Sequence, residues 1–229
     1  GVDEIDSGIG NDIIIGGRFG DILNAGQGDN IVLGDNGQIT AANDNVINFT
    51  GQPITLGLVE SVESLIGGPD TITTGIGRDI IIGGIDADVI VANFGEYDGF
   101  ESDSNNIIIG DSGYIDWTVA DAGRVYAHLS GQDPTSRSGD DIEASDIDRI
   151  FSTDPDHGGN DTITTGDGDD IIIGGEDGED VTEIITNGVT SGYTVATATN
   201  AKSKEGDLID AGQGNNLIFG DNGQITAAT

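Results

Sequence analysis

The sequence predicts an all-β protein built from short repeated strands, and three observations support this prediction. Apolar residues occur in short β-branched groups such as Ile13-Ile14-Ile15, separated by glycine-rich segments that would interrupt a helix. Long segments recur: residues 70–84 match residues 161–175 at 13 of 15 positions, and residues 20–42 match residues 206–228 at 16 of 23. Within these repeats an acidic or amide residue returns every nine residues, a spacing that gives no single apolar face on a helix.

The chain divides into three repeat units, each of which combines rows of the nine-residue repeat with a stretch that lacks it. The first unit is 1–66, with rows in 1–42 and a non-repeat excursion in 43–66; the second is 67–157, with rows in 67–116 and an excursion in 117–157. The third unit is 158–229, with rows in 158–179 and 206–229 on either side of an inserted hairpin in 180–205.

Each row has a polar residue, and in nearly every row a large aliphatic residue follows two positions later. The polar positions are Asp3, Asp12, Asp21 and Asn30, then Asp70, Asp79, Asp88 and Asn106, and finally Asp161, Asp170, Glu179, Asp207 and Asn216. The aliphatic residues, such as Ile5 and Ile14, are the expected core.

The strongly negative charge of the chain argues against several classes of binding partner. The chain has 42 Asp and Glu against 7 Lys and Arg, a formal net charge of −35. This charge would repel nucleic acid and anionic membrane surfaces, and no run of 18 apolar residues predicts insertion into a membrane. An apolar content of 35% argues against disorder, so we expect cations to neutralise the acids. The chain has no cysteine, which leaves a metal rather than a disulfide to stabilise the fold.

The rows resemble the nonapeptide G-G-x-G-x-D-x-U-x of the RTX calcium-binding repeat family, where U is a large aliphatic residue. The clearest copies are 7–15, 74–82 and 165–173, with Ser or Thr in place of the first glycine. The resemblance implies a right-handed parallel β-roll in which two nonapeptides form one coil. It also implies that the turns bind several Ca²⁺ ions and that the strands bury the U residue.

The resemblance further implies that polar residues 18 apart stack on one edge of the roll: Asp3 on Asp21, Asp12 on Asn30, Asp70 on Asp88, and Asp161 on Glu179. Ca²⁺ takes 6–8 oxygens from carboxylates and carbonyls, and glycine lets turn carbonyls point inward. The predicted calcium residues are Asp3, Asp12, Asp21, Asn30, Asp70, Asp79, Asp88, Asp161, Asp170, Glu179 and Asp207, with the turn glycines Gly8, Gly10, Gly75, Gly77, Gly166 and Gly168.

Two features allow alternative interpretations. The asparagines Asn30, Asn106 and Asn216 are either neutral ligands or residues that cap a ladder, and we favour the cap. The motif Gly34-Asp35-Asn36-Gly37, which returns in similar form at 110–113 and 220–223, is either one more ion-binding turn or a hairpin turn.

The excursions have alternating patterns that predict hairpins flanking the roll. Residues 114–119 and 124–129 alternate on either side of 120–123, and a second hairpin is expected around Thr186-Asn187-Gly188. The excursions hold most of the aromatic residues, so contact with a carbohydrate or another surface ligand is most plausible there.

The resemblance implies a structural function outside the cell. We expect a calcium-binding repeat segment of a large secreted bacterial protein, such as an adhesin stalk, surface-layer element or extracellular fibre, exported by type I secretion and folding on Ca²⁺. The alternatives are a ligand-binding adhesin module and a calcium-binding accessory domain of a secreted enzyme. The chain has no H-E-x-x-H, G-x-S-x-G or P-loop motif, so we do not expect an enzyme.

The expected location is extracellular or at the bacterial cell surface, and the expected partners are neighbouring repeats. The block at 20–42 returns at 206–228, so the chain ends at the same position of the repeat unit that it occupied 186 residues earlier. We therefore expect neighbouring repeats or further copies of the chain to stack end to end.

Overall fold

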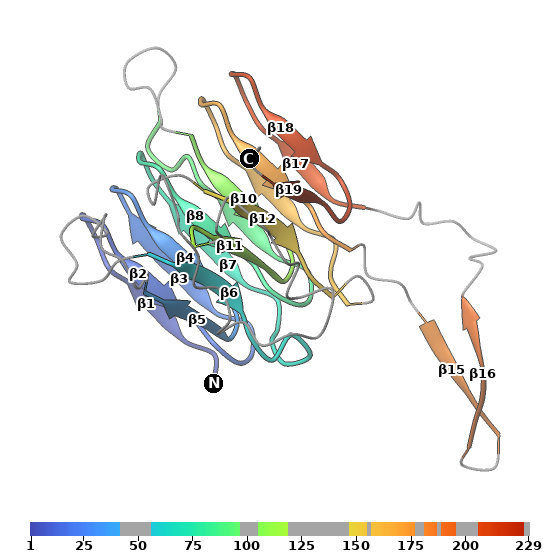
Figure 1. Ribbon diagram of the computed structural model, residues 1–229. Coiled ribbons are helices and arrows are strands. Elements are labelled where there is room, and N and C mark those ends of the chain that lie inside the picture. Colours follow the sequence, from blue (N-terminus) through green and yellow to red (C-terminus); the bar gives the residue numbers. More distant parts are fainter. Residues whose placement is uncertain are drawn as a thin grey trace.

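The computed structural model describes residues 1–41, 56–96, 105–118, 147–154, 157–176, 181–186, 189–195 and 206–226. All regular secondary structure in these residues is β: two parallel six-stranded sheets, a five-stranded sheet and a two-stranded hairpin. Figure 1 shows the strands stacked in chain order from the blue N-terminal end to the red C-terminal end. These ranges contain no helix with the length and apolar character that a membrane span requires.

Two parallel sheets form the roll. Sheet A has the order β1-β3-β7-β9-β13-β17, and its strands are β1 (Glu4–Asp6), β3 (Ile22–Gly26), β7 (Thr71–Thr74), β9 (Val89–Val91), β13 (Thr162–Thr164) and β17 (Leu208–Asp210). Sheet B has the order β2-β4-β8-β10-β14-β18, and its strands are β2 (Ile13–Ile15), β4 (Ile31–Leu33), β8 (Ile80–Ile82), β10 (Ile107–Ile109), β14 (Ile171–Ile173) and β18 (Leu217–Phe219).

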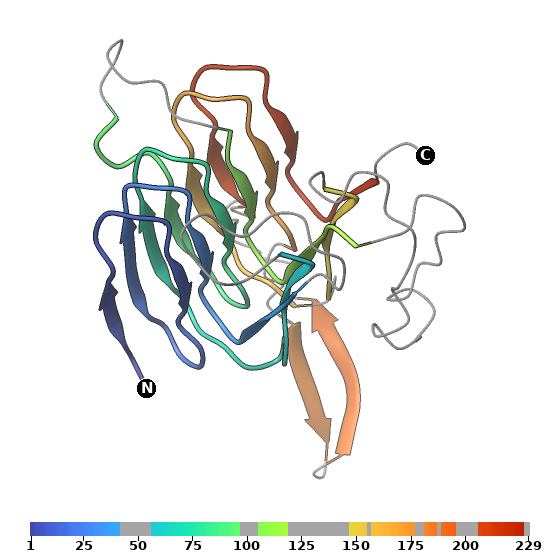
Figure 2. The same cartoon turned by 60° about the vertical axis from the view of Figure 1, so that its left-hand side comes forward.

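The chain passes alternately through the two sheets, so each coil adds one strand to sheet A and one to sheet B. Figure 2 shows the two sheets joined by successive turns. The middle residues of the triplets, such as Leu23, Ile72 and Ile81, are fully buried between the sheets and form one core cluster. This arrangement confirms the predicted all-β roll and the predicted core. The rows of all three units belong to the same two sheets.

A third sheet was not expected. Sheet C has the order β19-β12-β11-β6-β5, and its strands are β5 (Gly37–Thr40), β6 (Leu58–Ser61), β11 (Gly113–Asp116), β12 (Arg149–Ser152) and β19 (Gln224–Thr226). Every adjacent pair in it is antiparallel. Its inward side chains, including Val59, Ile115 and Ile150, pack with sheet B residues in a second core cluster. Sheet B therefore lies between sheets A and C.

This layering explains why the sheet B strands are apolar at all three positions. In β8, Ile80, Ile81 and Ile82 are all buried, because one neighbouring layer covers each face of the sheet. In the three-residue strands of sheet A only the middle residue faces another layer: in β9, Ile90 is fully buried and Val89 is 42% exposed.

The structure also changes the predicted hairpins. The pairing of 114–119 with 124–129 is wrong for Tyr114–Asp116, because β11 pairs on one side with β6 and on the other with β12. Residues 119–146 lie outside the described part of the chain. The hairpin predicted in 180–205 is confirmed: β15 (Val181–Thr186) and β16 (Val189–Val195) pair with each other.

The layering predicts unequal effects for the same substitution at equivalent positions of the repeat. Ile80 in sheet B is 3% exposed and Ile22 in sheet A is 51% exposed, although each directly follows the polar residue of its row. Ile80→Ala should lower the free energy of unfolding by about 2–5 kcal/mol, because it leaves a cavity between sheets B and C. Ile22→Ala should cost less than about 1 kcal/mol. Urea denaturation in saturating calcium measures both values, and equal losses would contradict the three-layer packing.

Candidate metal centres

The polar residues of the repeat form two ladders, one on each edge of the roll. The A-edge turns lead into sheet A and end at Asp3, Asp21, Asp70, Asp88, Asp161 and Asp207. The B-edge turns lead into sheet B and end at Asp12, Asn30, Asp79, Asn106, Asp170 and Asn216. On both edges the backbone N–H of each ladder residue donates to Oδ1 of the ladder residue in the next coil, over 2.6–3.0 Å.

Three of the four predicted stacked pairs are adjacent in these ladders. Asp3 donates to Asp21 over 2.7 Å, Asp12 to Asn30 over 3.0 Å, and Asp70 to Asp88 over 2.7 Å. The ladders also continue across the unit boundaries, as in the bond from Asp21 to Asp70, 49 residues later.

The fourth predicted pair, Asp161 with Glu179, is wrong. The residue that accepts from the Asp161 backbone N–H is Asp207, at 2.8 Å and 46 residues later. The inserted hairpin lies between strands β14 and β17 in the chain, so the strand of sheet A that pairs with β13 begins only at Leu208, directly after Asp207. Glu179 itself lies outside the described residues.

Each ladder hydrogen bond uses one carboxylate oxygen, and in several rows the other oxygen is left buried. Among the described residues, Oδ2 is buried without a hydrogen-bond donor in Asp12, Asp21, Asp70, Asp88 and Asp170. A buried polar atom with no partner costs about 1–3 kcal/mol, and more when it carries charge. These oxygens therefore favour a cation beside them.

Backbone carbonyls approach the same oxygens on the A-edge. A Cβ atom placed on Gly34 would lie 2.1 Å from Asp70 Oδ2 and 2.3 Å from the carbonyl oxygen of Gly83. A Cβ atom on Gly83 would lie 2.3 Å from Asp88 Oδ2 and 2.0 Å from the carbonyl oxygen of Gly110. Oxygens from neighbouring coils thus converge at the first residue of the turn, and only glycine fits there.

The donor set fits calcium. No three His, Cys, Asp or Glu side chains cluster in the described part of the chain, so carbonyl oxygens have to supply part of any coordination. Hard oxygen donors that mix carboxylate and carbonyl groups suit Ca²⁺, whereas structural zinc sites use Cys and His.

The predicted turn glycines lie on the B-edge. Gly8, Gly10 and Gly166 have φ of +91°, +141° and +85°, in the region that favours glycine. Gly77 and Gly168, with φ of +158° and +156°, lie at the edge of the same region. Gly75 is not among the residues with positive φ, so its backbone conformation does not require glycine.

The first two Gly-Asp-x-Gly motifs attach the excursions to the roll. The buried carboxylate of Asp35 accepts hydrogen bonds from the backbone N–H of Gly68 at 3.1 Å and of Ile85 at 2.6 Å. Asp111 accepts in the same way from Gly159 and Glu176. The motif was expected to be either an ion-binding turn or a plain hairpin turn, and these contacts support neither in its simple form. Both carboxylate oxygens of Asp35 and of Asp111 accept backbone N–H groups from two other segments.

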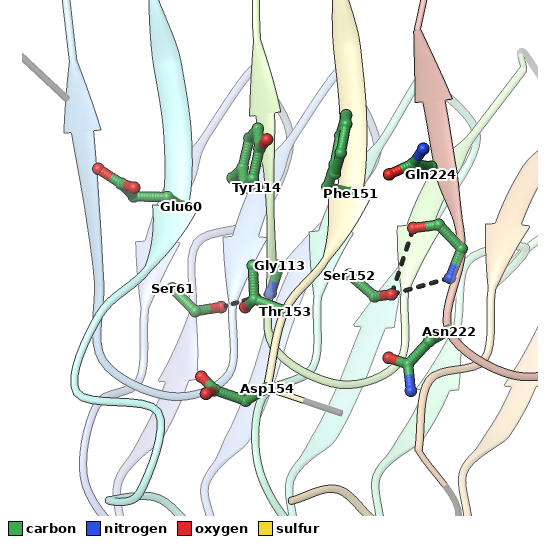
Figure 3. Close-up of a pocket in the computed structure, with 11 residues that line it drawn as sticks. Glu60, Ser61, Gly113, Tyr114, Phe151, Ser152, Thr153, Asp154, Asn222 and Gln224 are labelled. Carbon is green, nitrogen blue, oxygen red and sulfur yellow. Dashed lines mark hydrogen bonds between the residues drawn. The ribbon is translucent and has the colours of Figure 1, made fainter. Parts of the chain in front are cut away.

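The outer face of sheet C has a cavity of about 700 Å³ (Figure 3). Tyr114 and Phe151 stack in it with ring centroids 5.1 Å apart, and Glu60, Asp154 and Gln224 also line it. The two rings are only 2% and 5% exposed, so they offer little surface on which a sugar could stack. The ladders therefore remain the stronger functional candidate.

Burial changes the acidity of several carboxylates in the metal-free roll. It raises the pKa of Asp70 to about 7 and that of Asp88 well above its usual range, with a further contribution from Asp161 next to Asp88. Burial also raises the pKa of Asp35 to about 7 and of Asp111 to about 9.

Comparison with protein-family models matches four segments of the chain, residues 6–38, 66–96, 157–178 and 205–224, to the RTX calcium-binding nonapeptide repeat. No curated protein and no solved structure matches the chain.

The raised pKa values predict that the calcium-stripped protein loses stability as pH rises. A carboxyl group whose pKa is higher in the folded state stabilises the fold fully below its unfolded pKa of 3.8. That contribution is lost as pH rises through about 7 for Asp35 and Asp70, and about 9 for Asp111. The melting temperature should therefore fall between about pH 4 and about pH 9.

The measurement is thermal unfolding in about 0.5 M salt, which screens repulsion between surface charges. Saturating calcium should remove most of this fall at neutral and alkaline pH. A melting temperature that rises with pH in the stripped protein would contradict the assignment.

Proposed function

Because the chain carries RTX calcium-binding nonapeptide repeats, we propose that it is a calcium-dependent structural segment of a large secreted bacterial protein, such as an adhesin stalk, surface-layer element or extracellular fibre. RTX repeats bind calcium, and proteins that contain them are generally secreted. The observation that carries the proposal is the pair of ladders, which run through all six coils and leave buried carboxylate oxygens beside backbone carbonyls.

The residues that would hold the ions are the ladder aspartates with buried Oδ2 atoms and the carbonyls of the turn glycines. Bound calcium supplies positive charge that neutralises these oxygens and links adjacent coils. The aspartates position the oxygens, because the bond from the preceding coil to Oδ1 fixes each carboxylate.

Calcium binding would be coupled to folding. A chain with a net charge of −35 and no cation would have to bury like charges one coil apart. We infer that the chain is exported unfolded through a type I pathway and folds when it meets extracellular calcium. We propose no catalytic role. Tandem copies of this block in the parent protein would favour a stalk or fibre, whereas one copy beside a catalytic domain would favour an accessory module.

Calcium removal tests the function directly. Extracellular calcium modules bind at roughly 10⁻⁴–10⁻³ M, and binding to the folded state alone stabilises it by mass action. EGTA at neutral pH should abolish most of the β signal in circular dichroism, and excess Ca²⁺ should restore it, whereas Mg²⁺ at the same concentration should not. An unchanged spectrum and melting temperature in EGTA would refute the proposal.

We also propose that the two ends of the roll bind neighbouring repeats, in the same polypeptide or in a further copy. Strands β1 and β2 at one end, and β17 and β18 at the other, each have a single hydrogen-bonded neighbour within their parallel sheets. At the C-terminal end Leu208, Leu217 and Ile218 are 66%, 45% and 46% exposed. Open sheet edges with exposed apolar residues favour further strand pairing.

This proposal predicts elongated particles whose length grows with protein concentration in millimolar Ca²⁺, measured by small-angle scattering and analytical ultracentrifugation. Ile218→Lys should prevent the growth by placing a charge on the open edge. Phe94→Lys, which alters another exposed apolar side chain, should not. A compact monomer at all concentrations, together with a parent sequence that has no neighbouring repeats, would rule out end-to-end contact.

A further inference from the structure

The two edges of the roll differ in their ladder residues. On the A-edge all six are aspartate. On the B-edge aspartate and asparagine alternate along the stack: Asp12, Asn30, Asp79, Asn106, Asp170 and Asn216. The hydrogen bond to Oδ1 is the same in both kinds of turn, so the ladder itself does not require the alternation.

A second residue alternates with the first. The B-edge turns that end in aspartate begin with a hydroxyl residue, namely Ser7, Thr74 and Thr165, and the turns that end in asparagine begin with Ala25, Ala92 and Ala211. Thr74 and Thr165 are fully buried, and their Oγ1 atoms have no hydrogen-bond partner. In the turn 165–170 the hydroxyl of Thr165 and Oδ2 of Asp170 are therefore both buried oxygens without a partner.

In the turns that end at Asn30 and Asn216, the side-chain amide makes contacts inside its own turn. Asn30 Nδ2 donates to the carbonyl oxygen of Gly28 at 2.8 Å and to that of Gly26 at 3.3 Å, and also to Asp79 Oδ1 at 3.0 Å. Asn216 Nδ2 donates to the carbonyl oxygen of Ala211 at 2.9 Å. An amide N–H group thus meets the inward carbonyls that would otherwise face a cation.

We infer that the B-edge alternates between two kinds of turn: Ser/Thr–Asp turns that bind calcium, and Ala–Asn turns in which the asparagine amide takes the place of the ion. This inference rests on the proposed calcium function and adds to it an assignment of ions to particular turns. The hydroxyl supplies an additional oxygen where an ion binds, and alanine removes that oxygen where none does. The amide has no net charge, so an Ala–Asn turn satisfies its carbonyls without calcium.

Exchanging the Ser/Thr–Asp pair of one kind of turn for the Ala–Asn pair of the other, and the reverse, tests the inference. Thr165→Ala/Asp170→Asn converts a calcium turn into an amide turn, and Ala25→Ser/Asn30→Asp makes the opposite change. Calcium bound per chain is measured by equilibrium dialysis with radioactive Ca²⁺, and the melting temperature is measured in EGTA with trimethylamine N-oxide, which favours the folded state of the calcium-free chain. Asp6→Asn, which removes an exposed carboxylate from sheet A, is the control for charge alone.

The first double variant should bind one ion fewer than the natural sequence and melt about 2–4 °C higher without calcium, because it no longer buries oxygens that lack a partner. The second should bind one ion more and melt lower without calcium. Asp6→Asn should leave the number of ions unchanged. If the second variant does not fold, the number of ions bound by Asp170→Asn and by the first double variant still tests the inference.

Unchanged ion numbers in both double variants, with the natural sequence binding calcium normally, would overturn the inference and leave the proposed function intact. A natural sequence that folds without calcium would instead refute the proposed function. A first variant that loses the same number of ions but becomes less stable without calcium would show that the amide does not replace the ion.

Discussion

The structure depends on the different roles of the two oxygens of the ladder carboxylates. Oδ1 accepts the backbone N–H of the preceding coil and thereby fixes the position of the side chain, as between Asp21 and Asp70. In Asp12, Asp21, Asp70, Asp88 and Asp170, Oδ2 is then held in the interior without a hydrogen-bond donor. Proton or cation binding can each relieve this cost, because both remove the uncompensated charge. The hydrogen bond that aligns the coils thus also places a carboxylate oxygen where a cation can bind.

The third layer gives the roll a second hydrophobic core, in addition to the one between sheets A and B. Sheet C covers the outer face of sheet B, so residues such as Ile109 and Ile173 are buried in addition to the central row. Asp35 and Asp111 attach this layer, since each carboxylate binds one N–H where the chain returns from sheet C and another in the following turn. No strand in the described ranges covers the outer face of sheet A, where Ile22 and Val89 are exposed.

Nine-residue spacing was sufficient to predict the rows and the ladder pairs that lie 18 residues apart, such as Asp3 with Asp21. It could not predict Asp161 with Asp207, because the spacing says nothing about where the chain re-enters after an insertion. Sheet C was missed because its strands are short and their partners, such as β11 and β12, are far apart in sequence. A signal was present: Ile-Ile-Ile strands alternate with Thr-Ile-Thr strands, which indicates that one sheet is covered on both faces. The chemical role of each asparagine depended on side-chain contacts that spacing does not show.

The antiparallel order of sheet C determines where sequence can be added to the protein. Strands β5 and β11 both run opposite to β6, so the connections that follow Thr40 and Asp116 leave the sheet at the same end. Only β6 separates the two strands, which places their ends roughly 10 Å apart. The connections differ greatly in length, yet both return to equivalent strands, β6 and β12. Changes in the length or sequence of these two connections therefore leave the parallel sheets and their aspartate ladders unaltered.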